Sequence, residues 1–329
     1  MTVLVTGGAG YIGGHMVLAL LDRSEEVLVV DNLSTGFAGS VPAGAKLIVG
    51  DFGDQTLISS LLQKYPIDAI AHFAAKIVVP ESISDPLGYY LNNTSKARNL
   101  IESAVAAGVK NFIFSSTAAV YGDASEKPVG ETAPLRPLSP YGRSKLMVEW
   151  MLEDVARAAD FRYFVLRYFN VAGGDPQGRL GQSTPNSTHL IKRAVQTALG
   201  KRARIDVYGT DYPTRDGTCI RDYIQVSDLI DAHVAALDHL RRDGECLICN
   251  CGYGKGYSVK EVIEVVKRVS GIDFDVRSIA RRPGDPATIV AQSDLIRERL
   301  GWSPRNDNLE TIVRQAFDWE RRLHNSQGG

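Results

Sequence analysis

The chain lacks an excess of charge of either sign. Its 37 Lys and Arg residues stand against 38 Asp and Glu residues, for a formal net charge of -1 at pH 7. The charges are also spread along the sequence, with neither a basic stretch nor an acidic tail. A nucleic-acid-binding surface usually shows as a basic patch, so no nucleic-acid partner is expected. Any phosphate-binding site in this chain is therefore local.

Long apolar runs are missing as well. No stretch approaches the roughly 20 apolar residues that a membrane-spanning helix requires. The first residues, Met1-Thr2-Val3-Leu4-Val5-Thr6, lead directly into a glycine-rich loop, without the basic and apolar segments of a secretory signal. The sequence thus predicts a soluble, cytoplasmic protein with no membrane partner.

Cysteine is scarce, and three of the four cysteines fall within Cys246-Leu247-Ile248-Cys249-Asn250-Cys251. No second Cys or His pair stands at the spacing of a structural zinc site. The segment has the pattern of a short buried strand that ends at Gly252. We therefore expect thiols buried in a core, with no metal site and no disulfide framework.

What the chain does contain is an alternation of short apolar segments with longer amphipathic ones. This alternation is typical of parallel strands that helices cover on both faces. The expected strands are 2–6, 27–30, 47–49, 69–73, 111–114 and 164–168, and the expected helices are 11–21, 57–64, 91–107 and 141–158. The predicted fold class is α/β, a doubly wound parallel sheet of Rossmann type.

The character of the sequence changes at Asn170, where a loop rich in Gly, Pro and Gln begins. We interpret this change as the end of a dinucleotide-binding domain, residues 1–169, and the start of a second, smaller α/β substrate domain, residues 170–329. A segment around 217–243, helical in pattern over 226–240, is expected to return to the first domain.

A glycine motif lies between the first expected strand and the first expected helix. The residues Gly7-Gly8-Ala9-Gly10-Tyr11-Ile12-Gly13 fit Gly-x-x-Gly-x-x-Gly. Without side chains at Gly7 and Gly10, a pyrophosphate can reach the helix N-terminus, where N–H groups and the helix dipole favour anions. Gly13 allows helix and strand to pack closely. This context predicts a dinucleotide-binding loop.

Residues at the ends of the next strands specify the dinucleotide. Asp31 follows the second strand, where a carboxylate can accept both hydroxyls of the adenine ribose and would repel a 2'-phosphate. No arginine follows at once, so the expected cofactor is NAD. Asp51 is placed for the adenine edge, although capping of the next turn explains it nearly as well. Phe73-Ala74-Ala75 offers small residues near the cofactor.

A reactive centre is indicated by Tyr141 and Lys145, which stand four residues apart at the start of an expected helix. Residues at this spacing share one helix face, so the ammonium can favour the ionised phenol. Ser139 and Pro140 are the expected N-cap and first helical residue. Thr117, after the fifth strand, is the expected hydroxyl partner of Tyr141, although capping explains a Ser/Thr run equally well.

Taken together, the glycine loop, Asp31, Ser115-Ser116-Thr117, Tyr141-x-x-x-Lys145 and Arg167-Tyr168-Phe169-Asn170 resemble the extended short-chain dehydrogenase/reductases over nearly the whole chain. Within that superfamily the chain is most similar to the UDP-glucose 4-epimerase family, and looks most like the bacterial forms of exopolysaccharide synthesis. The segments that carry this similarity are Asp31-Asn32-Leu33, Tyr89-Tyr90-Leu91-Asn92-Asn93, Phe112-Ile113-Phe114-Ser115-Ser116, Tyr141-Gly142-Arg143-Ser144-Lys145-Leu146-Met147, Asp211-Tyr212-Pro213 and Ile220-Arg221-Asp222-Tyr223-Ile224.

The resemblance implies an NAD-dependent isomerase of galactose metabolism that interconverts UDP-glucose and UDP-galactose. Tyr141 is then the acid/base, Lys145 lowers the pKa of Tyr141 and holds the nicotinamide ribose, and Thr117 hydrogen-bonds the sugar O4. A hydride passes from sugar C4 to NAD, the 4-keto sugar rotates, and reduction on its other face inverts the configuration without net redox.

The resemblance also implies the binding residues and a homodimer. The cofactor contacts are Gly7, Gly10, Tyr11, Ile12, Gly13, Asp31, Asn32, Asp51, Phe52, Phe73, Ala74, Ala75, Asn92, Tyr141, Lys145 and Phe169. The substrate contacts are Thr117, Asn170, His189, Leu190, Tyr208, Arg221, Arg282 and Asp285, in a UDP-sugar-binding second domain with both arginines on the diphosphate. The expected helices 91–107 and 141–158 would pair across a two-fold axis.

Three positions depart from the family pattern. A cofactor-contacting lysine is displaced by one residue in Lys76-Ile77, Thr117 replaces the commoner serine, and Ile289 occupies the position that gates room for an N-acetyl group. The intermediate size of Ile289 leaves UDP-N-acetylhexosamines open as substrates.

Other functions remain as alternatives. A 4,6-dehydratase needs an acid and a base after the Thr, where this chain has Ala118-Ala119. A UDP-glucuronate 4-epimerase would differ mainly in cationic contacts to the C6 carboxylate. A non-catalytic NAD-binding sensor or scaffold is a further alternative, although such proteins usually lose the Tyr or the Lys.

Overall fold

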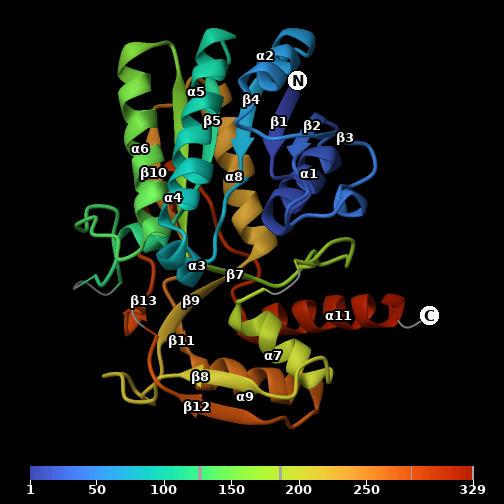
Figure 1. Ribbon diagram of the computed structural model, residues 1–329, viewed down its shortest axis with the longest axis vertical. Helices are drawn as coiled ribbons and strands as arrows, with labels where there is room; N and C mark the ends of the chain where they lie inside the picture. The colour runs from blue at the N-terminus through green and yellow to red at the C-terminus, as the bar shows by residue number, and fades with distance from the viewer. Residues whose placement is uncertain (125–127, 185–186, 283, 328–329) are drawn as a thin grey trace.

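The computed structural model describes residues 1–124, 128–184, 187–282 and 284–327. Figure 1 shows a large sheet with its helices in the upper part of the molecule and smaller sheets with α7, α9 and α11 below. The large sheet is parallel throughout and has the strand order β10-β6-β5-β4-β1-β2-β3. Its strands are β1 Thr2–Thr6, β2 Glu26–Asp31, β3 Lys46–Val49, β4 Ile67–His72, β5 Asn111–Thr117, β6 Arg162–Tyr168 and β10 Leu247–Cys251.

The predicted fold class is confirmed, with differences at strand ends. The strand expected at 111–114 extends to Thr117, because the polar residues Ser115 and Thr117 continue the hydrogen-bonded ladder with β6. The sheet also has a seventh strand, β10, the buried segment that carries Cys249 and Cys251. This strand comes from beyond residue 170 and pairs with β6 at the edge of the sheet.

Helices cover both faces of the large sheet. Alternate strand residues face opposite sides, so Val3 and Val5 pack with α1 and α8, whereas Leu4 packs with α2 and α5. Each such buried side chain contributes roughly 1.5–3 kcal/mol. On the first face lie α1 Tyr11–Asp22, α8 Val226–Arg241 and α10 Asp294–Leu300, and on the second α2 Gln55–Lys64, α5 Lys96–Ala106 and α6 Pro140–Ala158.

The helix expected at 91–107 differs from the prediction. After α3 Val79–Ser84 the chain forms α4 Pro86–Tyr89, a π-helical segment Tyr90–Ser95, and then α5. The π-helical turn contains the buried Asn93, whose amide bonds the backbone of Lys76 in both directions at 2.8 and 2.9 Å. It also reaches Ser144 of α6 at 3.1 Å. A side-chain requirement thus changes the helical period locally.

The lower part of the molecule contains two small sheets. In one, β9 Ile220–Gln225 pairs with β7 Asn170–Ala172, β11 Gly256–Ser258 and β13 Thr288–Ile289; the other joins β8 Ile205–Tyr208 to β12 Val276–Ile279. Helices α7 Leu190–Ala198, α9 Val259–Ser270 and α11 Leu309–Gln327 form a core there. From β9 the chain returns through α8, which packs on α1. The division into domains at residues 169 and 170 stays a prediction.

Among the described residues, no helix combines the length and the apolarity needed to cross a membrane.

Candidate active site

Thr117 and Tyr141 meet at the carboxyl end of β5. Thr117 is the last residue of that strand, and its hydroxyl accepts a backbone N–H at 3.1 Å and contacts Tyr141. The side chain of Ser139 caps α6 and Pro140 is its first residue, as predicted, so Tyr141 stands in the first helical turn. Both Thr117 and Tyr141 are buried. The structure therefore brings this predicted pair together from two elements.

Lys145 lies one turn further along α6 and is almost fully buried. Its Nζ donates to the carbonyl oxygen of Ser115 at 2.8 Å and lies 4.7 Å from the centre of the Phe114 ring. Burial lowers the pKa of Lys145 to about 7, and the nearby carboxylate of Glu149 opposes this effect. Near neutral pH the side chain is thus poised between ammonium and amine.

The expected lowering of the Tyr141 pKa by Lys145 stays a prediction. Burial raises the pKa of Tyr141, and the hydrogen bond with Thr117 lowers it in part. The contacts of the Lys145 ammonium in this structure are the Ser115 carbonyl group and the Phe114 ring. Thr117 is therefore the residue that favours the ionised phenol in this arrangement.

A buried ion pair behind the reactive centre is a feature that the sequence analysis missed. Arg167 of β6 binds Glu149 through Nη2 at 2.6 Å and through Nε at 3.1 and 3.2 Å. Ser116 donates to the same carboxylate, and the Arg167 Nη1 donates to Tyr121 at 3.1 Å. The sequence feature that could have indicated this pair is Glu149, which stands one helical turn after Lys145 on the same helix face. This network fixes the strand end that carries Thr117.

Neutral imidazoles lie under the same strand ends. His72 Nδ1 contacts the Thr6 hydroxyl at 2.6 Å, and His233 Nε2 contacts the Ser115 hydroxyl at 3.1 Å. Burial lowers the pKa of His72 to about 3 and that of His233 to about 4. Both rings are therefore uncharged at neutral pH and act as packing and hydrogen-bonding groups.

The glycine loop forms a cradle that excludes side chains. Gly7 has a φ of 76°, and a Cβ there would lie 2.7 Å from the backbone nitrogen of Ala74. A Cβ on Gly13 would lie 2.2 Å from the carbonyl oxygen of Gly7. Gly10 caps α1 without offering a side-chain acceptor to its first N–H groups. The loop thus leaves an open, anion-favouring helix start, as the motif predicts.

Asp31 is held against this loop. Its Oδ2 accepts the N–H of Ala9 at 3.0 Å, and its Oδ1 accepts the N–H of Leu33 at 2.8 Å. Each carboxylate oxygen keeps a further lone pair that can accept a ribose hydroxyl. The expected position of Asp31 beside the dinucleotide cradle is therefore seen in the structure.

Asp51 has the capping geometry that the sequence analysis left open. Its Oδ1 accepts the N–H of Gly53 at 2.8 Å, and its Oδ2 pairs with Lys96 at 2.5 Å. Burial raises the pKa of Asp51, but these bonds and the side chain of Asn32 outweigh burial, so the pKa is lowered. The carboxylate is charged and already partnered.

Of the three phenylalanines expected at the cofactor, Phe52 and Phe169 are buried and Phe73 is partly buried against the core. Phe52 and Phe73 pack with ring centres 4.9 Å from those of His72 and His233, respectively. Phe169 belongs to a buried cluster under the strand ends.

The remaining expected cofactor positions surround the helix start and the π-helical turn. Tyr11, in the first turn of α1, donates its hydroxyl to the Gly173 carbonyl at 2.8 Å, and Ile12 packs on the main core. Asn92 donates to Asn93 at 3.0 Å. The backbone of Ala74, followed by Ala75, closes on Gly7. A side-chain-free cradle beside a buried carboxylate fits a dinucleotide such as NAD.

Lys76, the displaced lysine, makes surface ion pairs. Its Nζ lies 3.3 Å from Glu81 and 3.1 Å from Asp85, and these partners raise the pKa of Lys76. A cofactor contact from Lys76 would require both pairs to break. The departure noted in the sequence therefore corresponds to a different use of this side chain.

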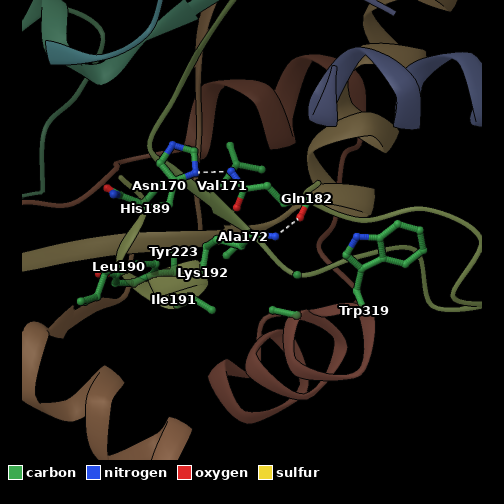
Figure 2. Close-up of a pocket in the computed structure, with 12 residues that line it drawn as sticks. Asn170, Val171, Ala172, Gln182, His189, Leu190, Ile191, Lys192, Tyr223 and Trp319 are labelled. Carbon is green, nitrogen blue, oxygen red and sulfur yellow. Dashed lines mark hydrogen bonds between the residues drawn. The ribbon is translucent and has the colours of Figure 1, made fainter. Parts of the chain in front are cut away.

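Three of the expected substrate residues line one pocket. Asn170 of β7, His189 at the N-cap of α7, and Leu190 face it together with Gln182, Lys192 and Trp319 (Figure 2). Burial lowers the pKa of His189, so its imidazole is neutral. The pocket was not visible in the sequence because its walls come from segments far apart in the chain.

The other four substrate residues form a second group. The guanidinium carbon of Arg282 lies 3.3 Å from the centre of the Tyr208 ring, and Arg221 Nη2 lies 3.8 Å from the Asp285 carboxylate. Arg221 lies on β9, two residues before Tyr223, and Tyr223 pairs with Asn170 of β7. The two groups are thus linked through one sheet.

Ile289 packs beside the reactive centre. It is buried in a cluster with Ala118, Val120, Phe169 and Ala291. Ala118 of this cluster directly follows Thr117 in the chain. This position fits a role in limiting substrate size.

The cysteines of β10 are buried thiols, as expected. Burial raises the pKa of Cys249 to about 12 and that of Cys251 well above its usual value. Within the described part of the chain, no three His, Cys, Asp or Glu side chains gather closely enough to hold a metal ion.

Comparisons with known proteins agree with this geometry. A model of the NAD dependent epimerase/dehydratase family matches residues 3–252. The UDP-glucose 4-epimerase of Azospirillum brasilense is 52% identical over 326 residues, covering 99% of this chain and 94% of the relative. The structure of UDP-glucose 4-epimerase from Bifidobacterium longum in complex with NAD+ and UDP has a TM-score of 0.94 at 35% identity, over 99% of both chains. The UDP-Glc/GlcNAc 4-epimerase of Campylobacter jejuni has a TM-score of 0.85 at 47% identity, over 98% of this chain and 99% of that one.

Proposed function

The chain belongs to the NAD dependent epimerase/dehydratase family, and on that premise we propose that it is an NAD-dependent isomerase that interconverts UDP-glucose and UDP-galactose. The reaction oxidises sugar C4 transiently and reduces the 4-keto sugar on its other face. The observation that carries this proposal is the buried contact of Thr117 with Tyr141, followed in sequence by Ala118-Ala119. A phenol and a hydroxyl without an adjacent acid–base pair support reversible proton removal from O4, not elimination.

Tyr141, Thr117 and Lys145 have different roles in the proposed reaction. NAD, when bound, supplies the acceptor of the electron pair from C4 and gives the pair back. Tyr141 removes the O4 proton and later returns it, and Thr117 favours the ionised phenol by hydrogen bonding. Lys145, anchored to the Ser115 carbonyl, is the group for the nicotinamide ribose. Inversion then follows from presenting the other face of the keto sugar.

Turning the hexose requires that the diphosphate stays in place. Arg221 and Arg282 are the cationic groups for it, and each is already oriented, by Asp285 and by the Tyr208 ring. A guanidinium binds phosphate oxygens through paired hydrogen bonds, so two of them hold the diphosphate firmly. The sugar beyond the diphosphate remains free to rotate.

Incubation of the purified protein with UDP-galactose, without added NAD, tests this function. Formation of UDP-glucose, followed by NMR, is the expected result, and NAD should be released when the protein is denatured. A folded sample that holds NAD but converts no UDP-hexose would instead point to a non-catalytic sensor.

UDP-N-acetylhexosamines are a second substrate class that the intermediate size of Ile289 leaves open. This side chain is of intermediate size and belongs to the buried cluster that contains Ala118, the residue after Thr117. Parallel assays with UDP-N-acetylgalactosamine and UDP-galacturonate measure how far the specificity extends. Equal turnover of UDP-N-acetylgalactosamine and UDP-galactose would show that the enzyme accepts both substrates.

We also infer a homodimer through α6 and the π-helical segment. Trp150 and Met147 stand three residues apart on α6, and Leu91 lies on the adjoining segment. All three are exposed, Trp150 at 51% and Leu91 at 59%. Apolar side chains on neighbouring helical segments suit a two-fold helical interface. Light scattering should give twice the chain mass, and Trp150→Glu should give a monomer, whereas Arg157→Glu on the same helix should not.

The division at residue 169 and the cytoplasmic location are also proposals. The first is supported by the separate core that α7, α9 and α11 form, and limited proteolysis tests it. Fractionation of cells tests the second.

A further inference from the structure

A line of polar contacts joins the nucleotide pocket to the C-terminal helix α11. His189, which lines the pocket, contacts the side-chain amide of Gln182 through Nδ1 at 2.8 Å. Lys192, in the first turn of α7, donates to the carbonyl oxygen of Gln182 and pairs with Glu320 of α11. Figure 2 marks both contacts of Gln182. Gln182 is therefore held by its backbone and holds His189 by its side chain.

The ion pair in this line is buried. The side chains of Lys192 and Glu320 are 7% and 2% exposed. Lys201 also binds the Glu320 carboxylate, at 2.9 Å. A buried ion pair contributes little net stability, because desolvation offsets attraction, but the loss of one partner leaves an uncompensated charge. Because Lys192 Nζ binds both the Gln182 carbonyl oxygen and Glu320, the pair ties the position of Gln182 to α11.

A second contact ties the same loop to α11 without using charge. The indole N–H of Trp319, next to Glu320, donates to the Ser183 hydroxyl at 3.2 Å. A Cβ on Gly181 would lie 2.3 Å from the Trp319 ring, so the loop packs directly on the indole. Two adjacent residues of α11 thus determine where residues 181–183 lie.

The position of this loop determines how the imidazole of His189 is oriented in the pocket. Because a side-chain amide NH2 group donates, the Nδ1 of the neutral His189 accepts, and its proton is on Nε2. Ser187 reinforces the arrangement, since its hydroxyl accepts the His189 N–H at 3.3 Å and contacts the Gln182 amide at 3.2 Å.

We propose that Lys192 and Glu320 are positioning residues for the UDP portion of the substrate, acting through Gln182 on His189 and on the start of α7. The proposal rests on the function proposed above. Neither residue belongs to the Thr117 and Tyr141 centre. The pair therefore governs nucleotide affinity and leaves the chemical step unchanged.

The test uses Lys192→Met and Glu320→Gln in the full-length protein, with UDP binding measured by calorimetry and turnover measured with UDP-galactose. In each variant the Kd for UDP and the KM should rise about tenfold, and kcat should stay within about twofold. Glu310→Gln is the matched control, because Glu310 lies on the same helix in exposed pairs with Arg314 and Arg268. That control should keep the wild-type Kd and KM.

If Lys192→Met and Glu320→Gln do not fold, a third variant tests the proposal. Gln182→Met removes the amide that contacts His189 and leaves the buried charges in place, so it should raise the Kd for UDP similarly. Folded variants with wild-type affinity, or a loss confined to kcat, would overturn the proposal. A wild-type protein that binds UDP but converts no UDP-hexose, with weakened binding in the variants, would refute the proposed reaction and leave the positioning role standing.

Discussion

Glu149 lies one helical turn after Lys145 on the buried side of α6, and its carboxylate raises the pKa of the Lys145 ammonium against the stronger effect of burial. The same carboxylate binds Arg167 and Ser116. The Glu149 carboxylate therefore raises the pKa of Lys145 and also holds Ser116, the residue before Thr117, in place.

Replacing this charge should change the pH profile of the enzyme. In Glu149→Gln the pKa of Lys145 should fall below its present value of about 7. Since the ammonium exists below that pKa, the alkaline limb of kcat/KM should move to lower pH. The other titratable neighbours of Lys145 are Tyr141, on the same helix, and His72. Burial keeps the His72 ring neutral. The unpaired Arg167 should also cost about 3–5 kcal/mol of stability.

The control for this experiment is Asp154→Asn, at an exposed position of the same helix. It should leave both the pH profile and the melting temperature unchanged. A folded Glu149→Gln protein with the wild-type profile would show that Lys145 does not depend on this carboxylate.

Tyr141→Phe should retain NAD and lose turnover. The substitution keeps the buried ring and removes the hydroxyl, so kcat should drop by about 10²–10⁴-fold. NAD released on denaturation, per mole of protein, verifies that the cofactor site is intact. Near-normal turnover would mean that another group removes the O4 proton.

Thr117 should be replaceable by serine but not by valine. Thr117→Val keeps the shape and removes the hydrogen bond that lowers the Tyr141 pKa, so the acidic limb of the kcat profile should move to higher pH. The loss in kcat should be about 10–100-fold. Thr117→Ser retains the hydroxyl and serves as the rescue. If both variants behave alike, the hydroxyl has no role.

Two glycine substitutions should separate folding from cofactor binding. Gly13→Ala places a Cβ 2.2 Å from the Gly7 carbonyl oxygen, a clash between backbone segments that should cost several kcal/mol and prevent NAD retention. In Gly10→Ala the nearest atom is 3.2 Å away, so the fold should survive. Melting temperature and NAD content measure the two effects. A stable Gly13→Ala protein with full NAD would refute the close approach.

Acid should destabilise the protein below pH 6.5. Burial lowers the pKa of His15 and His233 to about 4 and that of His72 to about 3, from 6.5. Between these values the unfolded state binds protons that the folded state does not. The stability contributed by each neutral ring is thus full above pH 6.5 and falls by about 2 kcal/mol by pH 5. Melting curves from pH 7.5 to 4.5 measure it, and His233→Gln should show a shallower slope.

Local pattern was enough to predict the parts of the fold that depend on neighbours in sequence. The glycine loop is specified by spacing, and the start of α6 by Ser139 and Pro140. The face shared by Tyr141 and Lys145 follows from helical periodicity. Six strands of the large sheet were also predicted from local pattern, because parallel strands inside a sheet have continuous apolar stretches, and even the edge strand β3 has a short one.

The place of the seventh strand in the large sheet and the partners of buried charges depended on tertiary structure. β10 joins β6 across nearly 80 residues of chain, and Lys192 meets Glu320 across 128 residues. Sequence spacing carries no information about such pairs, because any distant carboxylate could serve a given lysine. The Asn93 contacts that widen the helix at residues 90–95 belong to the same class.

The sequence by itself determined which groups are available for chemistry: a phenol, a hydroxyl, a lysine, a dinucleotide loop and two arginines. Only the tertiary structure decided their charge states. Burial raises the pKa of Tyr141 and lowers that of Lys145, and the group that helps the phenol is Thr117. The reason is physical, since a pKa depends on solvation and on nearby charges, and both are established only when distant segments pack together.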